Sequence, residues 1–245
     1  MPPLLERLGN RLARYLAAPS EQFRPTVVAG REARWWQYIR PGDVLLVEGS
    51  SRISTAIKYL TQSTWSHAAI CVGDAAPEPL VEADVVNGVI AVPYAKYADY
   101  NVRICRPIGL TDTDLRRLIT FVTGRLGLHY DLKNVIDLAR YLLPLAPVPS
   151  GLRRQLLAFG SGEPTRAICS TLIAEAFSSI PYPVLPNLPK DRDSSAAEVY
   201  YEIRHHSTFT PRDFDLSPYF AVVKPTIERQ FDYQTFPWQQ VIWLI

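Results

Sequence analysis

Cysteine is scarce in this sequence, with only Cys71, Cys105 and Cys169 among 245 residues. An odd number of cysteines without regular spacing excludes a disulfide framework and indicates a reducing compartment. Motifs typical of zinc fingers, phosphate-binding loops and dinucleotide-binding folds are also absent. We therefore expect a protein that needs no metal and no cofactor.

An excess of charge of either sign is lacking too, because 26 basic residues stand against 24 acidic ones and leave a net charge of +2. So small a net charge gives no electrostatic basis for binding nucleic acid, which we exclude as a partner. Hydrophobic residues make up 47% of the chain, a share typical of a compact globular protein rather than a disordered or fibrous one.

Long hydrophobic runs are missing as well: none could span a bilayer, and the N-terminus lacks the uninterrupted apolar stretch of a secretory signal. We expect a cytoplasmic protein without a cleaved signal. Within residues 4–16, however, apolar residues recur at helical spacing beside a face that carries Arg7, Arg11 and Arg14. The favoured interpretation packs this basic amphipathic helix on its own domain, and the alternative is peripheral contact with an anionic membrane surface.

We divide the chain into residues 1–33, an amphipathic N-terminal helix with a linker, and residues 34–245, one α+β domain. Short apolar runs bounded by glycine and proline predict strands at 44–47, 67–72, 80–85, 102–108 and 219–223. Apolar residues at helical spacing predict helices at 51–60, 112–125, 132–143 and 152–159, and a further one that begins at Cys169. Residues from about 132 to 160 form an unusually apolar insertion.

Cys169 stands in the first turn of the helix predicted from ICSTLIAEAF. The positive end of the helix dipole and a nearby imidazole both stabilise a thiolate, so this position suits a nucleophile. His67, at the head of a predicted strand, can supply the imidazole if that strand runs beside the helix. Each residue also has a structural interpretation, because isolated cysteines and strand histidines more often belong to the core.

A third group is needed to hold the tautomer and the orientation of the imidazole. Glu82, in PLVEADV, is the best candidate, since a hairpin loop of about four residues would set it directly opposite His67. A register one residue out would turn Glu82 to the other face of the sheet, and Asp84 or the backbone would then orient the ring.

The two other cysteines are weaker candidates for a nucleophile. Cys105 is a rival because Arg103 and Arg106 flank it in sequence, and nearby cations lower the pKa of a thiol. Cys71 lies within an apolar strand, where a cysteine is most simply part of the core. We favour Cys169 over both.

Four stretches resemble, in this order, the motifs of the permuted papain-like amidases, the YaeF/YiiX group related to NlpC: WSHAAICVG, LVEADVVNGV, GLHYD and ICSTLIAEAF. The resemblance runs from about residue 41 to 177 and weakly on to 225. Its most specific feature is the order histidine, acidic residue, cysteine, which inverts the usual papain order as circular permutation would. The family implies an antiparallel sheet that carries His67 and Glu82 and packs against the helix that bears Cys169.

By that resemblance Cys169 is the nucleophile, His67 the general base and then the general acid, and Glu82 the orienting group of a cysteine hydrolase. Such an enzyme cleaves an amide or ester bond through a thioester acyl-enzyme. Tyr130, in the Tyr-Asp motif, is expected to bind substrate, with packing as its alternative role. The substrate would be a peptide amide or a lipid acyl group.

Two alternatives to the amidase remain. The basic N-terminal helix and the apolar insertion favour a phospholipid acylhydrolase or acyltransferase that acts at a membrane surface. A module of another class would keep the papain-like groove only to hold a peptide or a lipid, without catalysis.

Overall fold

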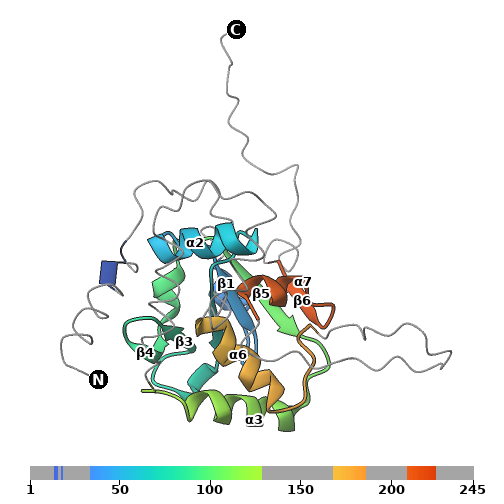
Figure 1. Cartoon of the computed structure of the whole chain (residues 1–245). Helices are drawn as coiled ribbons and strands as arrows, with labels where there is room; N and C mark the ends of the chain where they lie inside the picture. The colour runs from blue at the N-terminus through green and yellow to red at the C-terminus, as the bar shows by residue number, and fades with distance from the viewer. Residues whose placement is uncertain (1–13, 16–17, 19–33, 129–167, 186–208, 225–245) are drawn as a thin grey trace, which may run out of the picture.

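The computed structural model describes residues 14–15, 18, 34–128, 168–185 and 209–224, and every structural statement below concerns these residues (Figure 1). Their centre is one six-stranded sheet in the order β4-β3-β2-β1-β5-β6, with every neighbouring pair antiparallel. The strands are β1 (Val44–Val47), β2 (His67–Cys71), β3 (Leu80–Asp84), β4 (Gly88–Val92), β5 (Val102–Pro107) and β6 (Phe220–Val223). The predicted α+β class is confirmed.

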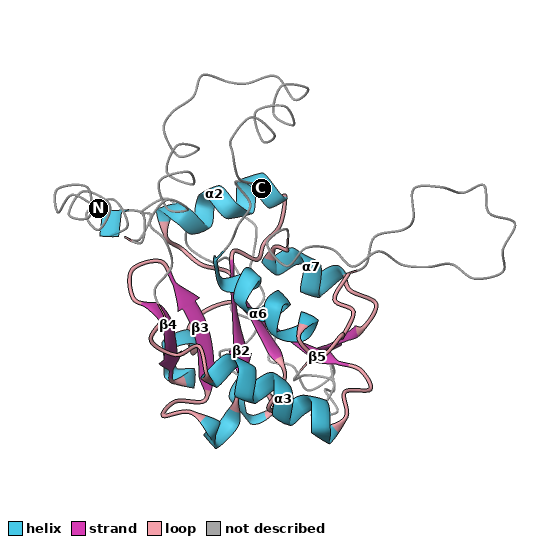
Figure 2. Cartoon of the chain, turned by 60° about the horizontal axis from the view of Figure 1, so that its bottom comes forward, coloured by secondary structure: helices cyan, strands magenta, loops and turns pink. Residues whose placement is uncertain are grey.

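The described helices are α2 (Arg52–Thr61), α3 (Asp112–Thr123), α6 (Ile168–Ser178) and α7 (Pro211–Leu216), with short 3-10 turns at η1 (Trp35–Gln37), η2 (Gly73–Ala75) and η3 (Tyr94–Tyr97). Three of the described helices, α2, α3 and α7, begin after a serine or threonine N-cap. The Thr111 hydroxyl accepts from the backbone N–H of Asp114 at the start of α3, a hydrogen bond typical of a threonine N-cap. Helices α3 and α6 lie together against one face of the sheet (Figure 2).

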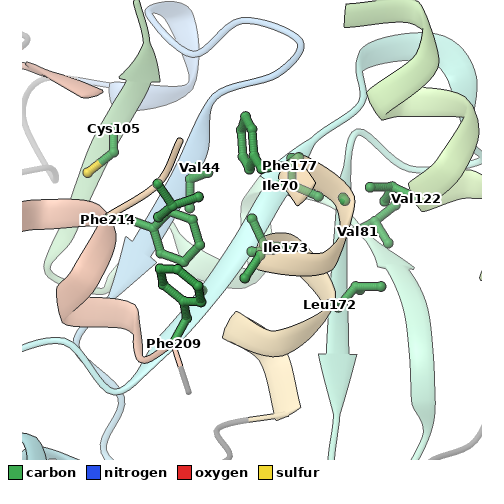
Figure 3. Packing of buried hydrophobic residues seen from close by; sticks show 14 of the residues in the cluster. Val44, Ile70, Val81, Cys105, Val122, Leu172, Ile173, Phe177, Phe209 and Phe214 are labelled. Carbon is green, nitrogen blue, oxygen red and sulfur yellow. The ribbon is translucent and has the colours of Figure 1, made fainter. Parts of the chain in front are cut away.

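Strand alternation divides the buried residues into two clusters, one on each face of the sheet. On the face covered by α6, the larger cluster joins Val44 and Leu46 to the helix, and Figure 3 shows part of it. On the opposite face, Leu45 and Val47 pack with the rings of Trp35 and Tyr97. Because both faces are covered, every residue of β1 is buried.

α6 supplies the centre of the larger cluster. Its apolar residues at helical spacing, Leu172, Ile173, Ala176 and Phe177, are fully buried. α6 contacts β2, β3 and α3, so it covers one face of the sheet over β2 and β3.

The strand that the sequence analysis missed is β4, which forms a hairpin with β3. Its turn is held by Asp84, whose Oδ1 accepts from the backbone N–H groups of Val86 and Asn87. Gly88 then takes φ 74, a conformation that favours glycine. The remaining strands match the predicted ranges to within two residues at each end.

Several predicted elements lie outside the described residues: the helices at 132–143 and 152–159, the apolar insertion, and nearly all of the helix at 4–16. Of the last, Arg14 and Tyr15 are described and are helical. The guanidinium of Arg52 lies 4.4 Å from the centroid of the Tyr15 ring, so this end of the segment contacts α2. No helix in the described ranges combines the length and the apolar character needed to cross a membrane.

Phe177→Ala should lower the free energy of unfolding by about 3–5 kcal/mol, because it leaves a cavity where the ring meets Phe214 and Phe220. Urea unfolding followed by fluorescence measures the change. The matched control is Ile108→Ala, whose side chain is 56% exposed and whose loss should change stability by no more than about 0.5 kcal/mol. Equal effects of the two variants would contradict this account of the core.

Candidate active site

His67 and Glu82 contact each other across two neighbouring strands. His67 begins β2, Glu82 lies in the middle of β3, and the Nε2 atom of the histidine is 3.1 Å from Oε2 of the glutamate. The Glu82 side chain is 1% exposed, whereas 22% of the His67 side chain reaches the surface. The contact occupies Nε2, and the second ring nitrogen, Nδ1, is left for another partner.

The register between β2 and β3 differs from the predicted one. Cys71 pairs with Leu80, and the connection between the strands spans residues 72–79, longer than the expected loop of about four. If this pairing is continued along the strands, Asp84 lies opposite His67. The prediction that Glu82 lies directly opposite His67 is therefore wrong. The difference is two residues, which preserves the face of a strand, and Glu82 therefore reaches the imidazole diagonally.

The backbone that precedes His67 is fixed by two bonds to distant parts of the chain. The Ser66 hydroxyl accepts from the backbone N–H of Gly49 at 3.0 Å, and the indole N–H of Trp65 donates to Asp215 at 3.0 Å. A Cβ at Gly49 would lie 2.9 Å from the Ser66 oxygen, so the close approach depends on glycine. These bonds tie the start of β2 to the end of β1 and to α7.

α6 brings Cys169 to the same imidazole. The cysteine lies in the first turn of the helix and is 5% exposed. Both a side-chain hydrogen bond with Cys169 and the charge of that residue act on the pKa of His67. The structure thus brings the predicted nucleophile, base and orienting group together, from α6, β2 and β3.

Charges on two sides of the imidazole control its protonation. Burial alone would lower the pKa of His67. The charge of Cys169, the charge of Glu82 and the hydrogen bonds to both residues outweigh burial and raise the pKa to about 10. His67 is therefore an imidazolium at neutral pH, between Cys169 and a buried carboxylate.

Glu82 has two further partners that the sequence analysis did not single out. The Lys96 ammonium donates to Oε1, and the Tyr97 hydroxyl donates to Oε2. Burial raises the pKa of Glu82, but His67 and then Lys96 lower it to about 2, so the carboxylate is ionised at neutral pH. Both residues belong to η3, which follows the missed strand β4, and no spacing in the sequence connects them to Glu82.

The two other cysteines are structural. Cys105 is fully buried, and although it lies on the same strand as Arg103, burial raises the pKa of its thiol to about 12. Arg106, its other neighbour in sequence, forms an ion pair with Asp43 instead. Burial also raises the pKa of Cys71, whose sulfur lies 3.6 Å from the Tyr94 hydroxyl. The preference for Cys169 over these two thiols agrees with this geometry.

Tyr130, the expected substrate-binding residue, lies outside the described residues. The chain just before it follows the edge of the sheet, since the N–H of Val89 in β4 donates to the carbonyl of Leu128 at 2.8 Å. Within the described ranges, no three His, Cys, Asp or Glu side chains are grouped as ligands of a metal ion would be.

Residues 38–141 match the model of a protein family described as permuted papain-like amidase enzyme, YaeF/YiiX, C92 family. The resemblance predicted from the motifs is confirmed. The matched segment of the permuted papain-like family includes His67, Glu82 and Tyr130 and ends before Cys169. In this chain the strands of the histidine and the glutamate come before the helix of the cysteine, which is the order of the motifs in the sequence.

Among solved structures, the chain is similar to the crystal structure of the metalloprotein yiiX from Escherichia coli O157:H7. The two are 16% identical, and the match covers 75% of this chain and 96% of that one at a TM-score of 0.46. No curated protein sequence matches the chain significantly.

Iodoacetamide at neutral pH should modify Cys169 in the folded protein and leave Cys71 and Cys105 intact, because burial in the sheet raises the pKa of both strand thiols. Peptide mapping by mass spectrometry distinguishes the three sites. In urea all three should react, which serves as the control. Labelling of Cys105 as fast as Cys169 in the folded protein would contradict the assignment of Cys105 to the core.

Cys169→Ala should lower the pKa of His67 by about one unit or more, since the substitution removes a charge and a hydrogen bond that favour the imidazolium. NMR titration of labelled histidine measures this in a chain with four histidines, with His67→Gln identifying the signal. Cys105→Ala is the control and should leave the titration unchanged. An unaltered His67 midpoint in Cys169→Ala would show that the thiol does not act on the imidazole.

Proposed function

We propose that this protein is a cysteine hydrolase that cleaves an amide bond through a thioester acyl-enzyme on Cys169. The observation that carries the proposal is the position of the His67 imidazole: its Nε2 atom lies 3.1 Å from the buried, ionised Glu82, and the neighbouring Cys169 raises its pKa. A thiolate beside an imidazolium is a pair suited to nucleophilic catalysis, and the carboxylate supplies the third group that orients the ring.

In the proposed reaction the Cys169 thiolate, paired with the His67 imidazolium, attacks the substrate carbonyl carbon, and the resulting oxyanion accepts a hydrogen bond from the backbone N–H of Cys169. That N–H lies in the first turn of α6, where backbone donors have no partner within a helix. His67 gives its proton to the leaving amine as the C–N bond breaks, and a thioester forms. The neutral imidazole then takes a proton from the water that attacks the thioester, and collapse of this intermediate releases the acid and restores the thiolate–imidazolium pair.

The state of Glu82 favours catalysis over a silent binding module. Burying an ionised carboxylate costs several kcal/mol unless partners compensate it. Here one of the compensating partners is the His67 imidazole, which also lies beside Cys169. The carboxylate charge therefore orients this ring and stabilises its protonated form. A groove that only holds a peptide or a lipid has no need of a charged group behind a histidine.

The match to an amidase family supports an amide as the bond cleaved. The thiol chemistry is the same for an ester, and the competing proposal, acyl hydrolysis or transfer on phospholipids at a membrane surface, rests on the N-terminal helix and the apolar insertion. Nearly all of both segments lies outside the described residues. The two proposals therefore differ in the substrate, and the products distinguish them.

Wild-type protein should release peptides from peptidoglycan fragments, and Cys169→Ala should lose this activity completely, because no other group replaces the sulfur nucleophile. Mass spectrometry of the products, with phospholipid vesicles offered in parallel, measures both substrate classes. Cys105→Ala is the matched control, since it removes a buried thiol remote from the imidazole and should keep full activity.

Release of fatty acid or lysolipid by the wild type alone would replace the amidase by the lipid acylhydrolase. Brief treatment with p-nitrophenyl acetate tests the acyl-enzyme itself, because it should leave an acetyl group on the Cys169 peptide. A protein that forms no such adduct, and whose products equal those of Cys169→Ala on every substrate, is not a cysteine hydrolase.

A further inference from the structure

Both oxygens of the buried Glu82 carboxylate are occupied by protein donors. Oε1 accepts from the Lys96 ammonium, while Oε2 accepts from the Tyr97 hydroxyl and lies 3.1 Å from the His67 ring nitrogen. The imidazole is thus one of three donors that share this charge. The other two, Lys96 and Tyr97, are consecutive residues of η3.

The fold places the side chains of Lys96 and Tyr97, both in η3, beside the Glu82 carboxylate. Glu82 pairs with Ile90 on β4, and η3 begins two residues after that strand ends, with Pro93 at its N-cap. The Tyr97 ring is 4% exposed and is packed edge-on against Tyr100 at 5.6 Å between centroids. Its hydroxyl is therefore held in place by packing as well as by the hydrogen bond.

Lys96 is held less tightly. Its side chain is 37% exposed, and its ammonium lies 5.4 Å from the centroid of the Tyr97 ring, within the range of a cation–π contact. The two residues of η3 therefore differ in what they offer Glu82: Tyr97 offers a rigid neutral donor, and Lys96 offers a positive charge near the surface.

We infer that Lys96 and Tyr97 are positioning residues, which hold Glu82 with Oε2 toward His67 and limit the share of its negative charge that the imidazole receives. The inference deepens the proposed function and rests on it, because it assigns a task to residues that act through Glu82. Neither side chain is expected to touch the substrate.

Such a limit matters because the imidazole must hold a proton before the reaction and must give that proton to the leaving amine during it. A fully available carboxylate would stabilise the imidazolium strongly, and an imidazolium that holds its proton too tightly is a poor acid for a leaving amine. A cation on the far oxygen draws carboxylate charge away from the ring and keeps it acidic enough to act. Burial and the charge of Glu82 raise the pKa of Tyr97, so its hydroxyl keeps its proton and acts as a donor.

The charged and titratable groups around this pair come from three elements and one loop. Cys169 of α6 and Glu82 of β3 act on His67, Lys96 and Tyr97 of η3 act on Glu82, and Tyr100 follows η3 and acts on Tyr97. Apart from His67 itself, Lys96 is the only basic residue in this group, so replacing it by a neutral side chain has an effect of defined sign. The pKa of His67 should rise in such a variant.

The test is the NMR titration of His67 in the Cys169→Ala background, where the contribution of the thiol is absent. Lys96→Met should raise the pKa of His67 by about 0.5–1 unit, and Lys96→Arg, which keeps the cation, should restore it. Tyr97→Phe should raise it too, because Oε2 then serves one donor fewer. Tyr94→Phe is the matched control, since that hydroxyl faces Cys71 and not Glu82, and it should leave the pKa of His67 unchanged.

An unchanged or lowered His67 midpoint in Lys96→Met overturns the inference, and so does a shift that Lys96→Arg fails to reverse. A loss of folding in Lys96→Met is recognised by circular dichroism, and the comparison of Tyr97→Phe with Tyr94→Phe then decides. Because the titration uses a variant without the nucleophile, its outcome does not depend on catalysis.

Turnover on paired substrates links the inference to the chemistry. Lys96→Met with Cys169 present should lose more activity on a p-nitroanilide than on the corresponding p-nitrophenyl ester, since only the amine must be protonated as it leaves. Equal losses on both would show that Lys96 supports the fold alone. Absence of any acetyl adduct on wild-type Cys169 would instead refute the proposed function, whatever the titration shows.

Discussion

An ionised carboxylate enclosed within the sheet is the constraint on which the surrounding structure depends. Glu82 is almost inaccessible to solvent, and its charge must be compensated by donors from the protein. Those donors come from β2 and from η3, so the strand register, the β3–β4 hairpin and the return of the chain over the sheet must all be correct together. An error in any of them would leave a buried charge without a partner.

The same constraint explains why the imidazole is so well placed. His67 sits at the first position of its strand, next to backbone that Ser66 and Trp65 tie to distant elements. Glu82 holds the Nε2 atom of the ring, and Cys169 of α6 acts on the same imidazole. Orientation of the histidine is therefore a property of the tertiary structure, with the carboxylate as the last of several contacts that limit its freedom.

Local rules predicted a large part of the fold. The Thr111 cap, the apolar face of α6 and the bounds of β1 follow from neighbouring residues alone. The grouping of Cys169, His67 and Glu82 was predicted because the order of three motifs resembles that of a known family, whereas each residue taken alone has an ordinary structural explanation.

What the sequence did not reveal depends on contacts between distant segments. The register of β2 and β3 is set by a connection that contains η2, and no turn motif announces a shift of two residues. β4 was missed because its short apolar run does not alternate clearly, and η3 was missed with it. Lys96 and Tyr97 were consequently invisible as partners of Glu82, since their contact arises only once β4 returns the chain beside β3.

The place of α6 in the chain has a consequence for biosynthesis. A ribosome completes β1 to β5 and α3 well before it adds the helix that bears Cys169. Until that helix docks, the sheet face of Val44, Ile70 and Val81 lacks its main cover, and such a surface favours aggregation of a nascent chain. Docking of α6 both covers that face and brings the sulfur to the imidazole, so an incomplete polypeptide holds the histidine and the glutamate without the thiol that we propose as the nucleophile.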